Sequence, residues 1–172
     1  MKLILNCLLI SLLLLSCSST KKTNNFYVVN QPAEFESQDA IWLIWPSIDY
    51  KEGESVEQVT LEIIEALIGD MDLVITCKNK ELLAHAKITL TNHFGELPRL
   101  KILEIQSYEI WARDMGPIFV ETNKNTPAIA DFNFNSWGYS DTLDIDTKTE
   151  EMCDVKVAEQ FNLPIISSAM IS

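Results

Sequence analysis

The sequence predicts an α/β fold, because short apolar segments alternate with longer amphipathic ones along most of its 172 residues. The short segments have the length of buried strands, and the longer ones repeat apolar residues with helical spacing. After the N-terminal apolar segment about 150 residues remain, which is enough chain for one domain with a substantial core.

The first half of that domain is expected to contain three strands separated by two helices. Ser55 can cap the first helix, and Gly95 stands where the second helix should end. The apolar stripe of the first helix is expected to come from Val56, Val59, Ile63, Ala66 and Leu67. The expected elements are a strand over Ala40–Trp45, a helix over Ser55–Ile68, a strand over Leu73–Thr76, a helix over Lys80–Phe94 and a strand over Leu100–Ile105.

The second half is expected to add further strands around one helical segment. Asp131 to Phe134 alternates polar and apolar residues, as a half-buried strand does, and Gly138 can adopt positive φ in the turn that follows. The expected elements are strands over Ile118–Glu121 and Ala128–Phe134, a mostly helical segment over Asp144–Phe161, and a last strand or strand pair over Leu163–Ile171.

The composition is strongly acidic. The chain has 13 Lys and Arg against 25 Asp and Glu, a formal net charge of −12. Nucleic acid is not an expected partner, because phosphate binding needs a basic surface. An acidic surface suits a small cationic ligand, although solubility is its commoner consequence. The five glycines form no Gly-x-Gly-x-x-Gly and no phosphate loop, which disfavours a nucleotide-binding fold.

Residues 1–17 have the pattern of a secretory signal of the bacterial lipoprotein type, because Lys2 precedes a short apolar run and Ser16 precedes Cys17. The apolar run is too short to span a bilayer comfortably. We favour lipidation of Cys17 over a plain signal peptide in which this cysteine is incidental. With residues 18–31 as a polar tether, the protein is expected to be exported and anchored to a membrane of a bacterial cell envelope.

A charged loop is expected between two strands, over Tyr108–Pro117. It contains Trp111, Arg113 and Asp114 and is stopped by Gly-Pro. Such a loop can aim a carboxylate at a cationic ligand, with an aromatic ring beside it to stack on a planar group. The alternative is a structural ion pair that fixes the turn, with the tryptophan filling the core.

Three motifs in this sequence resemble the agmatine deiminase family, which includes the bacterial (Porphyromonas-type) peptidylarginine deiminases. They are Trp-Ala-Arg-Asp-Met-Gly-Pro over 111–117, Asp-Phe-Asn-Phe-Asn-Ser-Trp-Gly over 131–138, and Trp-Leu-Ile-Trp-Pro over 42–46. The resemblance covers about residues 32 to 172, and the first motif is the most specific. It implies a partial five-bladed α/β propeller, in which about two ββαβ modules are present around a central active site.

The resemblance also implies roles for individual residues. Asp114 would be the catalytic carboxylate that holds a substrate guanidinium, and Trp111 would line the pocket. Asn135 and Trp137 would lie at the pocket rim, although a strand end followed by a tight turn explains them equally well. Arg113 would pin the loop to a neighbouring acid, because an inward arginine would repel the substrate. No cofactor and no metal is implied.

The implied reaction is hydrolysis of a guanidinium group, converting agmatine to N-carbamoylputrescine and ammonia. The alternatives are conversion of peptidyl arginine to citrulline, and an inactive cation-binding surface lipoprotein. The family uses a cysteine nucleophile near its C-terminus, a His-x-Asp segment and a Glu-Gly-Gly segment, and these do not occur in the 172 residues. Residues 32–172 are therefore expected to be the N-terminal part of such a catalytic domain, truncated, and a fragment unable to fold stably is a third possibility.

The remaining cysteines and histidines are expected to be structural. Cys77 ends an apolar strand and Cys153 lies in a helical segment, and a disulfide between them is left open. His85 and His93 share one helix face and have no metal-ligand spacing to either cysteine, which favours surface or packing roles.

Overall fold

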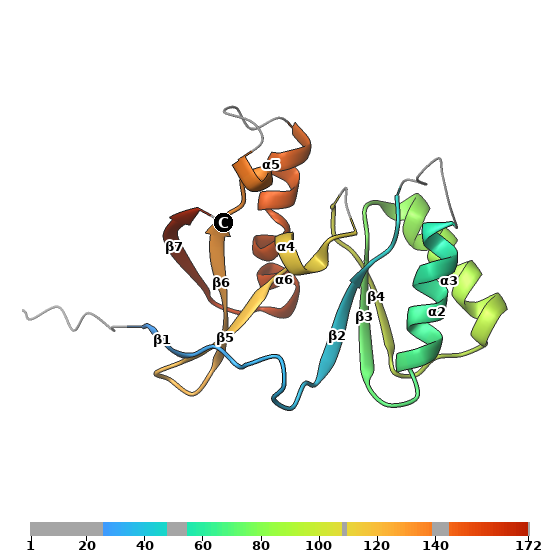
Figure 1. Cartoon of the computed structure of the whole chain (residues 1–172), viewed down its shortest axis with the longest axis horizontal. Coiled ribbons are helices and arrows are strands. Elements are labelled where there is room, and N and C mark those ends of the chain that lie inside the picture. Colours follow the sequence, from blue (N-terminus) through green and yellow to red (C-terminus); the bar gives the residue numbers. More distant parts are fainter. Residues whose placement is uncertain (1–25, 48–54, 108–109, 139–144, 172) are drawn as a thin grey trace, which may run out of the picture.

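Two sheets organise the part of the chain that the computed structural model describes, residues 26–47, 55–107, 110–138 and 145–171 (Figure 1). One sheet is parallel with strand order β2-β3-β4, and the other is mixed with order β1-β5-β6-β7. The elements are β1 Val28–Asn30, β2 Ala40–Ile44, α2 Val56–Leu67, β3 Asp72–Cys77, α3 Lys80–Phe94, β4 Leu100–Glu104, α4 Ala112–Met115, β5 Ile118–Thr122, β6 Pro127–Asn133, the 3-10 turn η1 Ser136–Gly138, α5 Ile145–Glu151, α6 Cys153–Phe161 and β7 Ile165–Ile171.

The parallel sheet is built from two consecutive strand–helix–strand units. Its strand order follows the chain order, so both connections cross in the same direction. With the usual right-handed crossover, this places both helices on the same face of the sheet. Figure 1 shows α2 and α3 together on one side of β2, β3 and β4.

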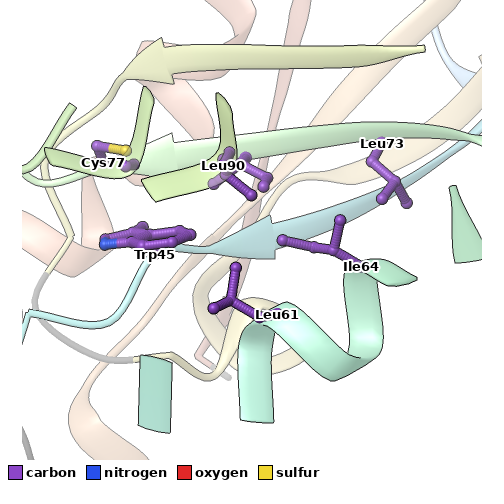
Figure 2. Close-up of a cluster of buried hydrophobic side chains, with 8 residues drawn as sticks. Trp45, Leu61, Ile64, Leu73, Cys77 and Leu90 are labelled. Carbon is purple, nitrogen blue, oxygen red and sulfur yellow. The ribbon is translucent and has the colours of Figure 1, made fainter. Parts of the chain in front are cut away.

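The core of this unit lies between the two helices and the sheet. Figure 2 shows Leu61 and Ile64 of α2 directed at the sheet, near Trp45 and Leu73. Ile64 is fully buried and Trp45 and Leu73 are 1% exposed. Burial of large apolar side chains of this kind contributes roughly 1.5–3 kcal/mol each, so this cluster is a main source of stability.

The predicted buried stripe of α2 is confirmed for Leu67, which packs against the core, and is wrong for Val59, Ile63 and Ala66. Val59 and Ile63 are 40% and 41% exposed, whereas Leu61 and Ile64 face the sheet. Both sets of residues are apolar and have helical spacing, so periodicity cannot tell which of them is buried. The packing of α2 against the sheet decides it. Ser55 does occupy the position before the first helical turn, but its side chain makes no capping hydrogen bond.

The mixed sheet contains the ββαβ order that the resemblance implies. β5 and β6 form an antiparallel hairpin, α5 and α6 follow, and β7 returns parallel to β6. The first unit differs, because its three strands are all parallel and alternate with two helices. The observed architecture is α/β, and the five-bladed closure stays a prediction.

The predicted polar tether over residues 18–31 differs from the structure at its C-terminal end, where the chain forms strand β1. Val28–Asn30 pairs antiparallel with β5, and the backbone N–H of Tyr27 donates to Asn123 Oδ1 at 3.3 Å. The apolar residues that precede Asn30 have β propensity and find an open strand edge, so they join the sheet. Residues 1–25, including Cys17, lie outside the described residues.

Helix α6 joins the two sheets. Its buried residues Cys153, Val157 and Ala158 form one cluster with Ile129 of β6 and Ile105, which directly follows β4. Trp42 of β2 packs against Phe161 of the same helix, with ring centroids 6.0 Å apart. The face of the parallel sheet opposite α2 and α3 is therefore covered by the second unit.

The structure answers the open question about the cysteines. Cys77 and Cys153 are both buried free thiols, and they lie in two different core clusters.

His85 is half exposed and its Nε2 lies 2.6 Å from Glu57 Oε2, in agreement with the predicted surface role. In the described ranges no helix has the length and apolarity needed to cross a membrane.

Two neighbouring isoleucines test the register of α2. We expect Ile64→Ala to lower the free energy of unfolding by about 2–5 kcal/mol, because it leaves a cavity in the core. Ile63→Ala should change it by about 1 kcal/mol or less, because this side chain is 41% exposed. Urea denaturation of both variants measures the difference, and equal losses would show that the register of α2 is wrong.

Candidate functional site

The segment predicted as a loop over Tyr108–Pro117 contains a short helix. Within its described part, residues 110–117, α4 occupies Ala112–Met115, so the prediction of a loop is wrong for these four residues. The amide N–H groups of Asp114 and Gly116 donate to the carbonyls of Trp111 and Ala112 at 3.0 Å each. Gly116 is extended and Pro117 follows, which ends the helix after one turn.

Met115 anchors this helix to the rest of the protein. Its side chain is 3% exposed and packs with Ile44 at the end of β2 and with Phe134, which directly follows β6. Because Met115 points into the core, the preceding residue, Asp114, stays at the exposed surface of the turn. The position of the carboxylate is thus set by an apolar contact.

Trp137 meets Asp114 from the second motif. Its indole N–H donates to Asp114 Oδ1 in a long hydrogen bond of 3.4 Å, and its ring packs edge-on against Phe134 with centroids 5.2 Å apart. Trp137 has φ 55° and ψ 22°, a left-handed conformation that costs a non-glycine residue about 1 kcal/mol. Such strain at an exposed aromatic residue is typical of a functional position.

The turn that holds Trp137 explains the role of Asn135. The backbone N–H of Gly138 donates to Asn135 Oδ1 at 3.0 Å, and Gly138 has φ 75°, which confirms the expected positive φ. The side-chain oxygen of Asn135 therefore closes the turn. In this structure Asn135 positions Trp137.

The structure brings together some of the predicted residues. Asp114 and Trp137 are in contact although 23 positions separate them, and Trp111 lies at the first turn of the same helix with 49% of its surface exposed. Arg113 pairs with Glu34, as predicted for a residue that pins the segment to a neighbouring acid. Both partners are largely exposed, so this pair contributes at most about 1 kcal/mol.

An acidic hollow of about 30 Å³ lies beside Asp114. Glu150, Glu151 and Asp154 contribute to its wall, and none of the described residues that line it is basic. Burial, the largest effect, and the neighbouring acids Asp131 and Glu151 together raise the pKa of Asp154 to about 7, against the lowering effect of the Val155 amide. Sequence reasoning missed these three residues, because an acidic stretch in a helical segment usually marks a solvated face.

Neither described cysteine is suited to nucleophilic attack. Burial raises the pKa of Cys77 and of Cys153 to about 12, so the reactive thiolate form is scarce at neutral pH. Among the residues that the structure describes, no group of three or more His, Cys, Asp and Glu side chains could hold a metal ion.

Comparison with known proteins identifies the family. The sequence profile described as Porphyromonas-type peptidyl-arginine deiminase matches residues 30–171. The chain belongs to this family. An agmatine deiminase of Medicago truncatula is 28% identical over 162 residues, which cover 88% of this chain and 42% of that protein. An agmatine deiminase of Stutzerimonas stutzeri is 26% identical over 126 residues, which cover 72% of this chain and 32% of that protein.

Solved structures share the fold. The agmatine deiminase of Enterococcus faecalis superposes with a TM-score of 0.66 at 21% identity, over 81% of this chain and 37% of that chain. An agmatine deiminase of C. jejuni with substrate bound superposes with a TM-score of 0.61 at 14% identity. The superposition covers 85% of this chain and 40% of that chain. The chain spans about two fifths or less of the length of these relatives.

Gly116 controls the placement of Asp114. A Cβ on Gly116 would lie 2.1 Å from the backbone oxygen of Ala112, so any side chain must displace the end of α4. We expect Gly116→Ala to lower stability by about 1–3 kcal/mol and to change the fluorescence of the exposed tryptophans. Gly69→Ala is the control, because nothing lies within 4 Å of its Cβ. Equal melting temperatures for the two variants would contradict this reading.

Proposed function

We propose that this chain carries the guanidinium-holding part of an enzyme that hydrolyses a guanidinium group to a ureido group and ammonia. The observation that carries the proposal is the contact between Asp114 and Trp137, two motif residues that the fold brings together at an exposed position. The relatives named agmatine deiminase support this class of reaction.

Asp114 is the residue to which we assign the catalytic role of holding the cation. A carboxylate offers about four acceptor sites, so it can accept from Trp137 and still receive two parallel N–H donors of a planar guanidinium. Trp111 and Trp137, each about half exposed, offer aromatic faces for the substrate's planar end or alkyl stem. Asn135 supports this arrangement through the turn.

Agmatine is our preferred substrate, and a peptidyl arginine is the second candidate. The hollow beside Asp114 has an acidic wall, which suits a ligand with a second positive charge. Residues 131–138 contain no arginine that could bind the carboxylate of a peptide. The family description points to the peptidyl substrate. The binding experiment below compares agmatine with an arginine peptide and so distinguishes the two candidates. An inactive cation-binding protein would bind both without turnover.

Catalysis requires more than this site. Attack on the guanidinium carbon needs a thiolate, and departure of ammonia needs an acid/base. The buried thiols of Cys77 and Cys153 do not meet the first requirement. In the proposed enzyme both groups come from chain beyond these 172 residues, for which the length of the relatives leaves room.

Ligand binding to the chain tests the role of Asp114. We expect agmatine to bind more tightly than 1,4-diaminobutane, which lacks the guanidinium, and more tightly than a blocked arginine peptide. Asp114→Asn should weaken agmatine binding about tenfold or more, because it removes a charge-assisted hydrogen-bonding partner. Isothermal titration calorimetry measures all three ligands.

Glu65→Gln is the matched control, since it removes one acidic charge at an exposed position of α2. Equal agmatine affinities for Asp114→Asn and Glu65→Gln would reduce the effect to general electrostatics and would contradict the assigned site. Absence of agmatine binding to the folded chain would do the same.

We also propose that the protein is exported and held to a membrane by acyl chains on Cys17. The support is the sequence of residues 1–17, in which a basic start and an apolar run precede Ser16-Cys17. An acylated N-terminus anchors a protein without a membrane-spanning helix.

Metabolic labelling tests the anchor. We expect labelled palmitate to be incorporated into the chain, and Cys17→Ser to abolish both the label and recovery in the membrane fraction. Cys7→Ser is the control, because Cys7 lies inside the predicted signal, and should leave both unchanged. Label retained in Cys17→Ser would exclude this residue as the acylation site.

A further inference from the structure

Two carboxyl groups meet where helix α6 packs against the mixed sheet. Asp154 in the first turn of α6 is 6% exposed, and its side chain lies within hydrogen-bonding reach of Asp131 on β6. Ser167 Oγ of β7 donates to Asp131 Oδ2 at 3.0 Å, and the Val155 amide donates to Asp154 Oδ1 at 2.6 Å. The pair therefore connects one helix with two parallel strands.

One oxygen of this pair needs a donor. Asp131 Oδ1 is buried and accepts no hydrogen bond from the described residues. Buried polar atoms are nearly always hydrogen-bonded, because leaving one unpaired forfeits its interaction with water. Two carboxyl groups can hydrogen-bond only when one of them carries a proton. A proton on Asp154 would provide a donor at this carboxyl pair.

The surroundings favour that proton. Within the described ranges, the titratable groups that act on Asp154 or line the hollow with it are acidic: Asp131 on β6 and Glu151 on α5 act on it directly, and Glu150 on α5 and Asp114 on α4 share the wall of the acidic hollow with it. Burial, the largest effect, together with Asp131 and Glu151 raises the pKa of Asp154 to about 7. The Val155 amide acts in the opposite direction and does not offset them.

We propose that Asp131 and Asp154 share one proton and form a pH-sensitive clamp that holds α6 to β6 and β7. When the proton is present, helix and strands are joined by a carboxyl–carboxyl hydrogen bond. When it is lost, the buried carboxylate of Asp154 faces the partly buried carboxylate of Asp131, whose Oδ1 has no donor. β6 leads directly to Phe134 and Trp137, so the clamp supports the strand that carries Trp137 to Asp114. This proposal does not depend on the proposed guanidinium chemistry.

The raised pKa of Asp154 determines how the stability of the folded protein changes with pH. The pKa of Asp154 is about 7 in the folded protein, against 3.8 for the ordinary side chain, so the folded state retains the proton longer than the unfolded state. This contribution to stability is fully present below pH 3.8 and is lost as the pH rises through 7. The clamp therefore holds in mildly acidic solution and opens in mildly alkaline solution.

Thermal unfolding of the full chain at pH 5 and pH 8 tests the clamp. The amide of Asp154→Asn can donate to Asp131 Oδ1 at every pH, so this variant should melt about 5 °C or more above the unmodified protein at pH 8. The difference should be smaller at pH 5. Glu65→Gln, a matched acid-to-amide change on exposed surface, should follow the unmodified protein at both values.

An Asp154→Asn variant that melts at or below the unmodified protein at pH 8 would overturn the proposal. If this variant fails to fold, the titration of ¹³C-labelled aspartate side chains in the unmodified protein decides. One carboxyl carbon should titrate near pH 7, and its absence would overturn the proposal as well.

Discussion

The structure depends on the packing of helix α6 between the two sheets. Val157 and Ala158 are essentially fully buried there, between Ile129 of β6 and the residues that follow β4. The parallel sheet carries its own helices on one face only, so its other face would expose apolar side chains without this contact (Figure 1). The same contact fixes the separation of β2 and β6, and these two strands lead to Ile44 and Phe134, between which Met115 is held.

The position of Asp114 is a consequence of that separation. The carboxylate lies on a helix of one turn, too short to be stable by itself, so its geometry comes from the burial of Met115 and from the close approach at Gly116. Trp137 is held in a left-handed conformation by the Asn135 turn and by Phe134. A change in the apolar contact of Met115 with Ile44 and Phe134 would therefore move the polar pair.

Local patterns in the sequence predict most strands and helices, the end of α3 at Gly95 and the positive φ of Gly138. The motifs also select Asp114 and Trp137, which the fold places in contact. Features decided by partners distant in sequence are missed, such as the buried stripe of α2 and the pairing of β1 with β5. Asp154 belongs to this class, because its sequence neighbours indicate a solvated helix, whereas the fold buries it beside Asp131 of β6.

The acidic groups around Asp114 link the two proposals electrostatically. Each carboxylate in a small hollow makes ionisation of its neighbours less favourable, so either a proton or a bound cation relieves the same repulsion. A cation held by Asp114 would lower the pKa of Asp154, and a proton on Asp154 would weaken the attraction for the cation. Linkage requires these two effects to be equal in free energy. In electrostatic terms, binding of a cationic substrate and retention of the clamp proton would therefore oppose each other.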